Sequence, residues 1–253
     1  MDTEMQKATE VSRVALIPGG IRGIGRSLAL MLARRGWAIA ACYRKSGADA
    51  ATLQSELQAS GARFLIVRAD VSNPDLAQNL VRQVESEFGR IDALINCIGS
   101  YHRVPLMEES IEGWHSMFDD NLHPVFYLSR AVAPGMMQRG WGRIINFSMV
   151  NADQQVAQPF VTAHYIAKIG VLVLTRSLAR MLAPKGITVN AISPGFIESG
   201  SVPLEELSQS FKSIPAGYLG TPDDIAAAVS YLLSDEARYV NGANIQVSGG
   251  WGV

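Results

Sequence analysis

Residues 18–25 read Pro-Gly-Gly-Ile-Arg-Gly-Ile-Gly and follow an apolar run at residues 14–17. The run predicts a buried strand, and the apolar spacing of Leu28 and Leu32 predicts an amphipathic helix over residues 23–35. A glycine-rich turn between a strand and a helix lets backbone N–H groups and the helix N-terminus face a phosphate. The turn therefore predicts an α/β fold that binds the pyrophosphate of a dinucleotide.

The rest of the chain continues this alternation. Further strands are predicted at residues 37–43, 64–68, 93–96, 143–148, 188–192 and 244–247. Helices are predicted at residues 48–60, 73–88, 110–138 and 160–182, with another beginning at Thr221, and Pro124 and Pro134 should bend or interrupt the third of them. Alternating helices and nearly continuous apolar strands predict a Rossmann-type, doubly wound parallel sheet in a single domain over residues 1–253.

Two segments stand outside this pattern. Residues 1–10 are polar and lack the apolar centre of a signal peptide, so we expect them to be disordered. Residues 198–218 are rich in Ser, Pro and Glu and have weak periodicity, and a long irregular segment at this place predicts a substrate lid.

Composition narrows the class of partner. A net charge of −1 argues against a nucleic acid or an anionic membrane held by electrostatic attraction. No apolar stretch is long enough to span a bilayer, so we expect a cytoplasmic protein without a membrane partner. His102, His115 and His123 do not predict a metal site.

The spacing of the glycines in the turn indicates more closely which kind of α/β fold the chain adopts. Gly19 allows a sharp turn, Gly23 a close approach to the pyrophosphate, and Gly25 tight packing of the helix on the sheet. The resulting Gly-x-x-x-Gly-x-Gly pattern resembles the short-chain dehydrogenase/reductase family, although Pro18 stands where that family usually has Thr.

Further segments carry the same resemblance in the same order along residues 12–250. They are Asp70-Val71 after the third strand, Asn96 and Gly99 after the fourth, Asn121 within a helix, residues 193–199 (Ser-Pro-Gly-Phe-Ile-Glu-Ser) and the tail at 242–250. The resemblance implies a nicotinamide cofactor held by Gly19, Gly23, Ile24, Gly25, Asp70, Val71, Asn96, Gly99, Lys168, Pro194, Gly195, Ile197 and Ser199. It also implies a homo-oligomer, either tetramer or dimer, and free thiols at Cys42 and Cys97.

The end of the second strand selects between the two nicotinamide cofactors. An acidic residue there would bind the ribose 2′-hydroxyl of NAD, and none is present. Arg44 and Ser46 can instead bind a 2′-phosphate, and Arg22 offers a second cation. These residues predict NADP(H).

The expected catalytic positions agree only in part with the family. Its members use a Tyr four residues before a Lys as proton donor, with a Ser and an Asn in support. Lys168 and Asn121 match, whereas His164 holds the Tyr place and Met149 holds the Ser place. Tyr165 and Ser148 are the adjacent candidates, since each lies one residue from the expected position.

Three interpretations follow. His164 donates the proton, Tyr165 reaches the site through a modest helix twist, or no protein acid is needed because the substrate double bond is already activated. The function predicted is an NADPH-dependent reductase of a small organic substrate with an activated C=C, a C=N or pterin-like ring, or a carbonyl. The alternative is a catalytically degenerate protein that binds NADP(H) in a sensing or non-redox role.

Overall fold

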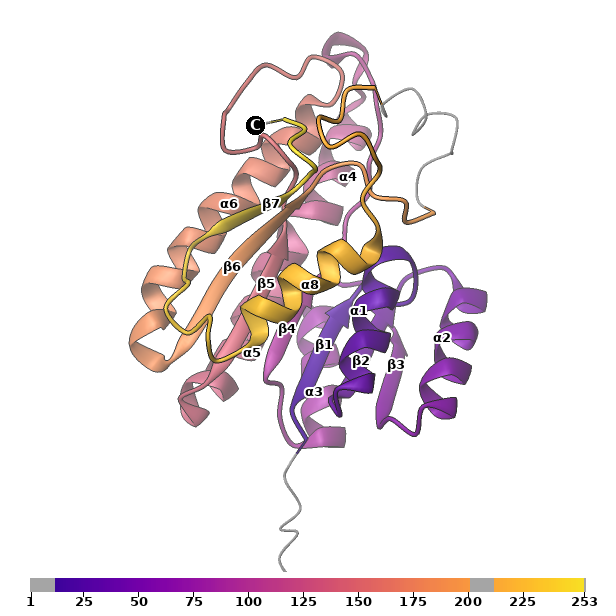
Figure 1. Ribbon diagram of the computed structural model, residues 1–253, viewed down its shortest axis with the longest axis vertical. Helices are drawn as coiled ribbons and strands as arrows, with labels where there is room; N and C mark the ends of the chain where they lie inside the picture. Colours follow the sequence, from indigo (N-terminus) through magenta and orange to yellow (C-terminus); the bar gives the residue numbers. More distant parts are fainter. Residues whose placement is uncertain (1–11, 201–211, 253) are drawn as a thin grey trace, which may run out of the picture.

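A seven-stranded parallel sheet forms the centre of the molecule in the computed structural model, which describes residues 12–200 and 212–252 (Figure 1). Its strands are β1 (Val14–Pro18), β2 (Ala38–Tyr43), β3 (Phe64–Arg68), β4 (Ala93–Asn96), β5 (Gly142–Phe147), β6 (Ile187–Pro194) and β7 (Asn244–Val247). They lie in the order β3-β2-β1-β4-β5-β6-β7, so the strand order reverses its direction at the β1–β4 pair. This order confirms the predicted doubly wound, Rossmann-type sheet.

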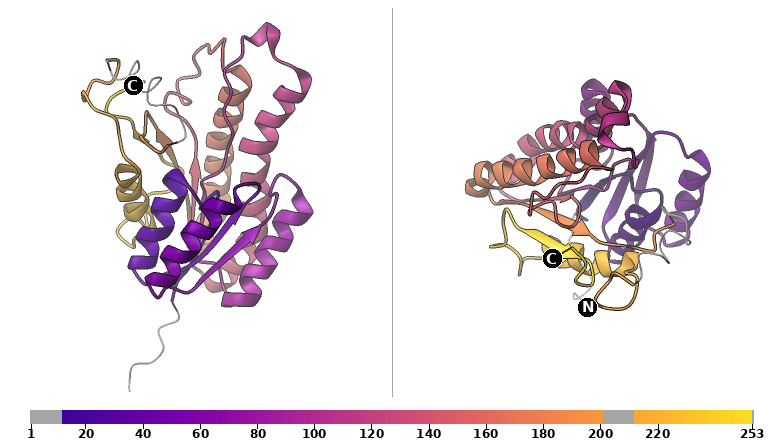
Figure 2. Two further views of the ribbon diagram at one scale, coloured as in Figure 1. Left: turned by 90° about the vertical axis from the view of Figure 1, so that its right-hand side faces the viewer. Right: turned by 90° about the horizontal axis from the view of Figure 1, so that it is seen from above.

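Helices cover both faces of the sheet (Figure 2). They are α1 (Gly23–Arg34), α2 (Gly47–Ala59), α3 (Pro74–Phe88), α4 (Ile111–Asn121), α5 (His123–Arg139), α6 (Thr162–Leu182) and α8 (Pro222–Leu233). Side chains of α1, α2 and α8 join one hydrophobic core, and side chains of α3, α5 and α6 join the other. Short 3-10 helices lie at Leu106–Glu108 and Ala183–Lys185.

The strands divide their side chains between these two cores. In β1, Ala15 and Ile17 pack in the core of α1, whereas Val14 and Leu16 pack in the core of α3. All five β1 residues are buried because a strand alternates its side chains between two covered faces. This double burial explains why the strands read as continuous apolar runs in the sequence.

The predicted helix over residues 110–138 is two helices. It is interrupted at Leu122, and Pro124 then lies in the first turn of α5, where its missing N–H leaves no hydrogen bond unmade. Pro134 lies inside α5 and does not end it. The break sets α4 and α5 apart as separate elements, and α4 packs on α6 beside the carboxyl ends of the strands.

The predicted start of α8 is confirmed in detail. Thr221 precedes Pro222 and forms a capping box with Asp224, whose carboxylate accepts from the Thr221 backbone N–H at 2.7 Å. Residues 1–10, predicted to be disordered, lie outside the described residues, and so do residues 201–211 of the predicted lid. Ile197 and Gly220, which lie just outside the predicted lid on either side, form a parallel bridge.

Burial of α1 against the sheet positions the glycine turn, and this burial can be tested. Leu28 is fully buried between α1 and the sheet. We expect Leu28→Ala to lower the free energy of unfolding by about 2–5 kcal/mol, because it removes buried methyl groups and leaves a cavity. Urea unfolding followed by circular dichroism measures the change. Leu76→Ala, at a position that is 43% exposed in α3, serves as control and should cost about 1 kcal/mol or less.

Candidate functional site

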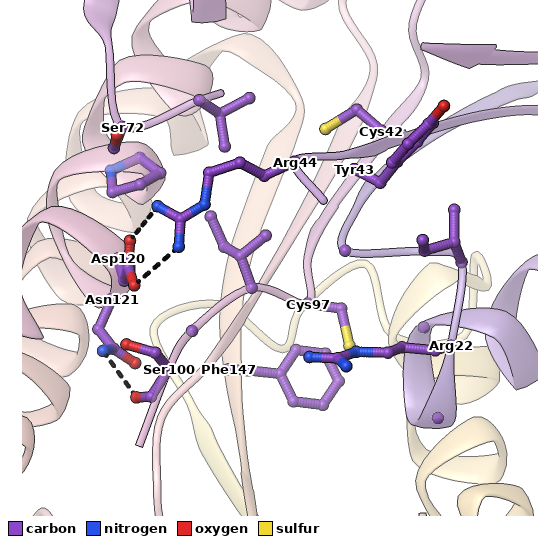
Figure 3. A pocket seen from close by; sticks show the side chains of 18 of the residues that line it. Arg22, Cys42, Tyr43, Arg44, Ser72, Cys97, Ser100, Asp120, Asn121 and Phe147 are labelled. Carbon is purple, nitrogen blue, oxygen red and sulfur yellow. Dashed lines mark hydrogen bonds and ion pairs between the residues drawn. The ribbon is translucent and has the colours of Figure 1, made fainter. Parts of the chain in front are cut away.

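A cavity of about 680 Å³ opens at the carboxyl ends of the strands, beside the β1–β4 pair. Its walls come from the glycine turn after β1, the ends of β2 and β3, the loop after β4, and helices α4 and α6 (Figure 3). Ligands of open α/β sheets bind in this crevice, where neighbouring strands send their connections to opposite faces. The cavity is therefore the candidate functional site.

The turn after β1 packs its backbone directly against the backbone of the loop after β4 and of α1. Gly19 has a φ of +76°, and a Cβ there would lie 2.2 Å from the Cys97 carbonyl oxygen. A Cβ on Gly25 would lie 2.3 Å from the Gly19 carbonyl oxygen. Both positions therefore require glycine, since any side chain would separate the turn from the β4 loop or from α1.

The first turn of α1 is open to an anion. Arg22 precedes α1 in an extended conformation and makes no side-chain capping bond, and the first turn holds no acidic residue. The unpaired N–H groups and the helix dipole can therefore bind negative charge in the cavity. Gly19, Arg22, Gly23, Ile24 and Gly25, which the sequence analysis predicted as cofactor residues, all line the cavity.

Charged side chains gather at the end formed by β2 and β3. Arg44, Ser46, Asp70 and Val71 line the cavity here, at the places where the resemblance put cofactor contacts. Asp70 accepts from the Ser72 hydroxyl at 2.7 Å and from the Ser72 backbone N–H at 3.1 Å. The guanidinium of Arg44 donates to the Asp120 carboxylate of α4, which raises the pKa of Arg44.

Asn121 and Lys168 meet at the other end of the cavity. The Asn121 amide donates to the carbonyl oxygens of Ser100 at 3.0 Å and Met117 at 2.9 Å, while its Oδ1 has no partner among the described residues. Lys168 is buried and donates to the Phe147 carbonyl at 3.0 Å. A Cβ on Gly99 would touch both groups, at 2.4 Å from Asn121 Oδ1 and 3.2 Å from Lys168 Nζ. Gly99 therefore leaves the space in which these two polar groups face the cavity.

Burial lowers the pKa of two basic side chains here, Lys168 and His164. It lowers the pKa of the Lys168 ammonium to about 8. Burial, followed by the charges of Lys168 and His102, lowers the pKa of His164 to about 3. His164 is therefore a neutral imidazole at pH 7.

His164 and Tyr165 separate on α6. His164 lines the cavity, its Nδ1 has no partner among the described residues, and its ring meets the Tyr101 ring edge-on at 5.3 Å. The Tyr165 hydroxyl instead donates to the Asn151 carbonyl at 2.7 Å and accepts from the Val156 N–H at 3.1 Å. Adjacent helix positions point about 100° apart, so the structure brings His164 to the cavity and engages Tyr165 with the loop after β5.

Ser148 and Met149 separate in the same way. Ser148 lines the cavity, and its hydroxyl donates to the Lys168 carbonyl at 2.8 Å. Met149 packs against the cluster that contains Tyr165 and Leu172. Ser148 thus ties the end of β5 to α6 beside Lys168.

Several predicted cofactor residues lie elsewhere. The Asn96 amide is buried and donates to Asn146 Oδ1 at 2.8 Å, which links β4 to β5 behind the cavity. Pro194, Gly195 and Ile197 lie outside the cavity wall, whereas Ser199 forms part of it. Gly195 approaches the backbone of Ser248, which places it against the end of β7.

Sequence reasoning missed two features of the site. Asp120 was not singled out, although it directly precedes Asn121, because an ion pair between residues 76 positions apart leaves no local pattern. Ser100, whose carbonyl orients Asn121, was also missed. The position of Ser100 directly after Gly99 was the available signal.

Two further observations limit the chemistry of the described residues. Within residues 12–200 and 212–252, no group of three or more His, Cys, Asp and Glu side chains could hold a metal ion. Cys42 and Cys97 are free thiols, as expected, and burial raises the pKa of each to about 12.

No helix in the described part of the chain is long and apolar enough to cross a membrane.

Comparison with known proteins agrees with this geometry. A protein family described as Enoyl-(Acyl carrier protein) reductase matches residues 19–252. An acetoacetyl-CoA reductase of Allochromatium vinosum is 38% identical over 245 residues, which are 95% of this chain and 98% of that protein. A 3-oxoacyl-(acyl-carrier-protein) reductase of Staphylococcus aureus is 37% identical over 244 residues, with 95% and 98% of the two chains covered.

Solved structures extend the comparison to the fold. A short chain dehydrogenase from Bacillus anthracis has a TM-score of 0.87 at 34% identity, covering 95% of this chain and 97% of that chain. Acetoin dehydrogenase from Enterobacter cloacae has a TM-score of 0.86 at 30% identity, covering 96% of each chain. The sheet and the glycine turn define an α/β protein of the Rossmann type. The chain belongs to the short-chain dehydrogenase/reductase family of oxidoreductases.

The close approach at Gly19 predicts a specific loss of stability. Gly19→Ala should destabilise the protein more than Gly36→Ala, although both glycines have φ near +80°. Gly36 has nothing within 4 Å of an added Cβ, so its substitution carries only the backbone cost of about 1–2 kcal/mol. We expect Gly19→Ala to exceed that cost by about 1–3 kcal/mol in urea unfolding. Equal losses would show that the contact with Cys97 relaxes freely.

The buried neutral state of His164 predicts a pH-dependent stability. The unfolded chain binds a proton near pH 6.5 and the folded protein only near pH 3. The contribution of this group is therefore present above pH 6.5 and is lost as the pH falls toward 3. Between pH 7 and pH 5 the free energy of unfolding should fall by about 2 kcal/mol through this histidine. His164→Gln should remove that part of the slope in urea unfolding, and His115→Gln, at an exposed position, is the control.

Proposed function

We propose that this protein is an NADPH-dependent reductase of a small organic substrate. The observation that carries the proposal is one cavity whose wall includes the glycine turn, Arg44, Asn121, His164 and Lys168. A bound dinucleotide would place its pyrophosphate at the glycine turn, with its adenosine and nicotinamide groups on either side. The uncapped start of α1 fits the pyrophosphate, and the unpartnered Oδ1 of Asn121 fits a polar group at the reacting end.

Particular residues would hold the cofactor. Gly19, Gly23 and Gly25 would admit the pyrophosphate, and Arg22 and Arg44 would bind the 2′-phosphate with help from Ser46. Asp70 and Val71 would contact the adenine, Lys168 the nicotinamide ribose, and the segment with Pro194, Gly195, Ile197 and Ser199 the nicotinamide. When bound, the reduced nicotinamide supplies a hydride to the substrate. The remaining chemistry at the site belongs to the chain.

The acid–base groups support a substrate that needs little help from a protein acid. The Tyr165 hydroxyl is engaged by Asn151 and Val156, and a His164 pKa near 3 leaves no imidazolium at pH 7. Lys168, with a pKa near 8 in the cavity wall, can hold or exchange a proton in the neutral range. An activated C=C, or a C=N as in an oxidised pterin, fits this set of groups.

A carbonyl substrate is the alternative that the names of the related reductases support. Their names give acetoacetyl-CoA and a 3-oxoacyl group as the substrates of those proteins. A carbonyl oxygen that becomes an alkoxide gains most from a proton donor. These substrates therefore belong in the same test.

The protein also has apolar surface suited to a homo-oligomer. Phe126 of α5 is 44% exposed and Val173 of α6 is 57% exposed, although both helices otherwise pack on the sheet. We include a dimer or tetramer formed through these two helices in the proposal, with molecular mass in solution as its test.

Cofactor binding and turnover test the proposal together. We expect NADPH to bind more tightly than NADH in a fluorescence titration, and NADPH to be oxidised in the presence of an enone, an imine, an oxidised pterin or acetoacetyl-CoA. His164→Gln should lower kcat less than about tenfold, because loss of a true general acid costs about a hundredfold or more. Tyr165→Phe is the matched variant and should change turnover no more than His164→Gln.

Other outcomes identify the alternatives. A hundredfold loss in His164→Gln would make His164 the proton donor, and the same loss in Tyr165→Phe alone would assign that role to Tyr165. Tight NADPH binding without turnover of any substrate class would favour a sensing or non-redox protein. Binding of neither cofactor would overturn the proposal.

A further inference from the structure

An ion pair crosses the cofactor end of the cavity. Arg44, directly after β2, reaches Asp120 of α4, with Nη1 at 2.8 Å from Oδ1 and Nη2 at 3.3 Å from Oδ2 (Figure 3). Both side chains line the cavity. The pair therefore joins two of its walls through the space between them.

The pair uses the fork of the guanidinium. A carboxylate that accepts from Nη1 and Nη2 occupies one of the two edges of the guanidinium through which Arg binds a phosphate in bidentate fashion. Asp70 adds a second negative charge, with its Oδ2 at 3.9 Å from Arg44 Nη1. Arg44 is thus neutralised by the protein itself, on the side that faces the cavity.

Arg22 differs from Arg44 in this respect. Among the described residues, no carboxylate lies within ion-pair distance of Arg22, which also lines the cavity. The Asp120 side chain is only 16% exposed, so its charge is weakly solvated and depends on Arg44 for its partner. Separating Arg44 from Asp120 therefore costs more free energy than separating a fully exposed ion pair.

We propose that Asp120 sets the cofactor selectivity of this protein by holding the Nη1/Nη2 fork of Arg44, for which a 2′-phosphate competes. This inference rests on the proposed function. Asp120 is a positioning residue in it, since it acts through Arg44 and weakens the preference for NADPH over NADH. The unmodified ribose of NADH carries no phosphate to compete for the fork, so its binding does not depend on breaking the pair.

Calorimetric titration of NADPH and NADH tests the inference without any turnover. Asp120→Asn keeps the shape of the side chain and removes its charge, which frees the fork of Arg44. The ratio of the NADH Kd to the NADPH Kd should rise by about threefold to tenfold, the effect of releasing one partly exposed ion pair. Glu112→Gln is the matched control, because it removes one negative charge from the same helix at an exposed residue outside the cavity wall. The ratio should stay within about twofold of wild type in that variant.

A double-mutant cycle assigns the effect to Arg44. In an Arg44→Met background, Asp120→Asn should leave the Kd ratio unchanged, because no guanidinium remains to be released. A ratio that is unchanged or falls in Asp120→Asn alone would overturn the inference, and so would an equal rise in Glu112→Gln. Thermal unfolding of each variant separates these results from loss of the fold. Wild-type protein that binds neither cofactor would instead overturn the proposed function.

Discussion

The contact between the turn after β1 and the loop after β4 is the constraint on which the cavity depends. Gly19 lies so near the Cys97 carbonyl that no side chain fits between them. This approach joins the two strands at which the sheet reverses its order, and it leaves the start of α1 facing the opening. A second close approach, between Gly99 and Asn121, places the Asn121 end of the cavity against the same loop.

The charged groups at the two ends of the cavity differ in their pairing. Lys168 is buried without a carboxylate partner among the described residues, and it faces the unpartnered Oδ1 of Asn121 across Gly99. Its charge adds to burial in keeping His164 neutral. At the other end, Asp120 neutralises Arg44. Among the described residues, Lys168 thus lacks a carboxylate partner, whereas Arg44 has one.

Helix α6 shows how one residue of register decides chemistry. Lys168 and His164 lie four residues apart and therefore share a face, while Tyr165 turns toward the loop after β5 and holds it through two backbone contacts. The phenol of Tyr165 therefore binds the loop after β5 and does not line the cavity. The proposed preference for activated substrates follows from this distribution of groups, with Lys168 as a proton-exchanging side chain in the cavity wall.

The sequence by itself determined the succession of strands and helices along the chain, the glycine turn and most of the cavity wall. These follow from local patterns, because double burial makes strands apolar and a backbone contact requires glycine. Only the tertiary structure decided the direction in which individual side chains point. Asn96 binds Asn146 behind the cavity, Tyr165 turns to Asn151, and Arg44 pairs with Asp120. Each of these contacts joins segments whose approach depends on the packing of the whole sheet, so no local pattern records it.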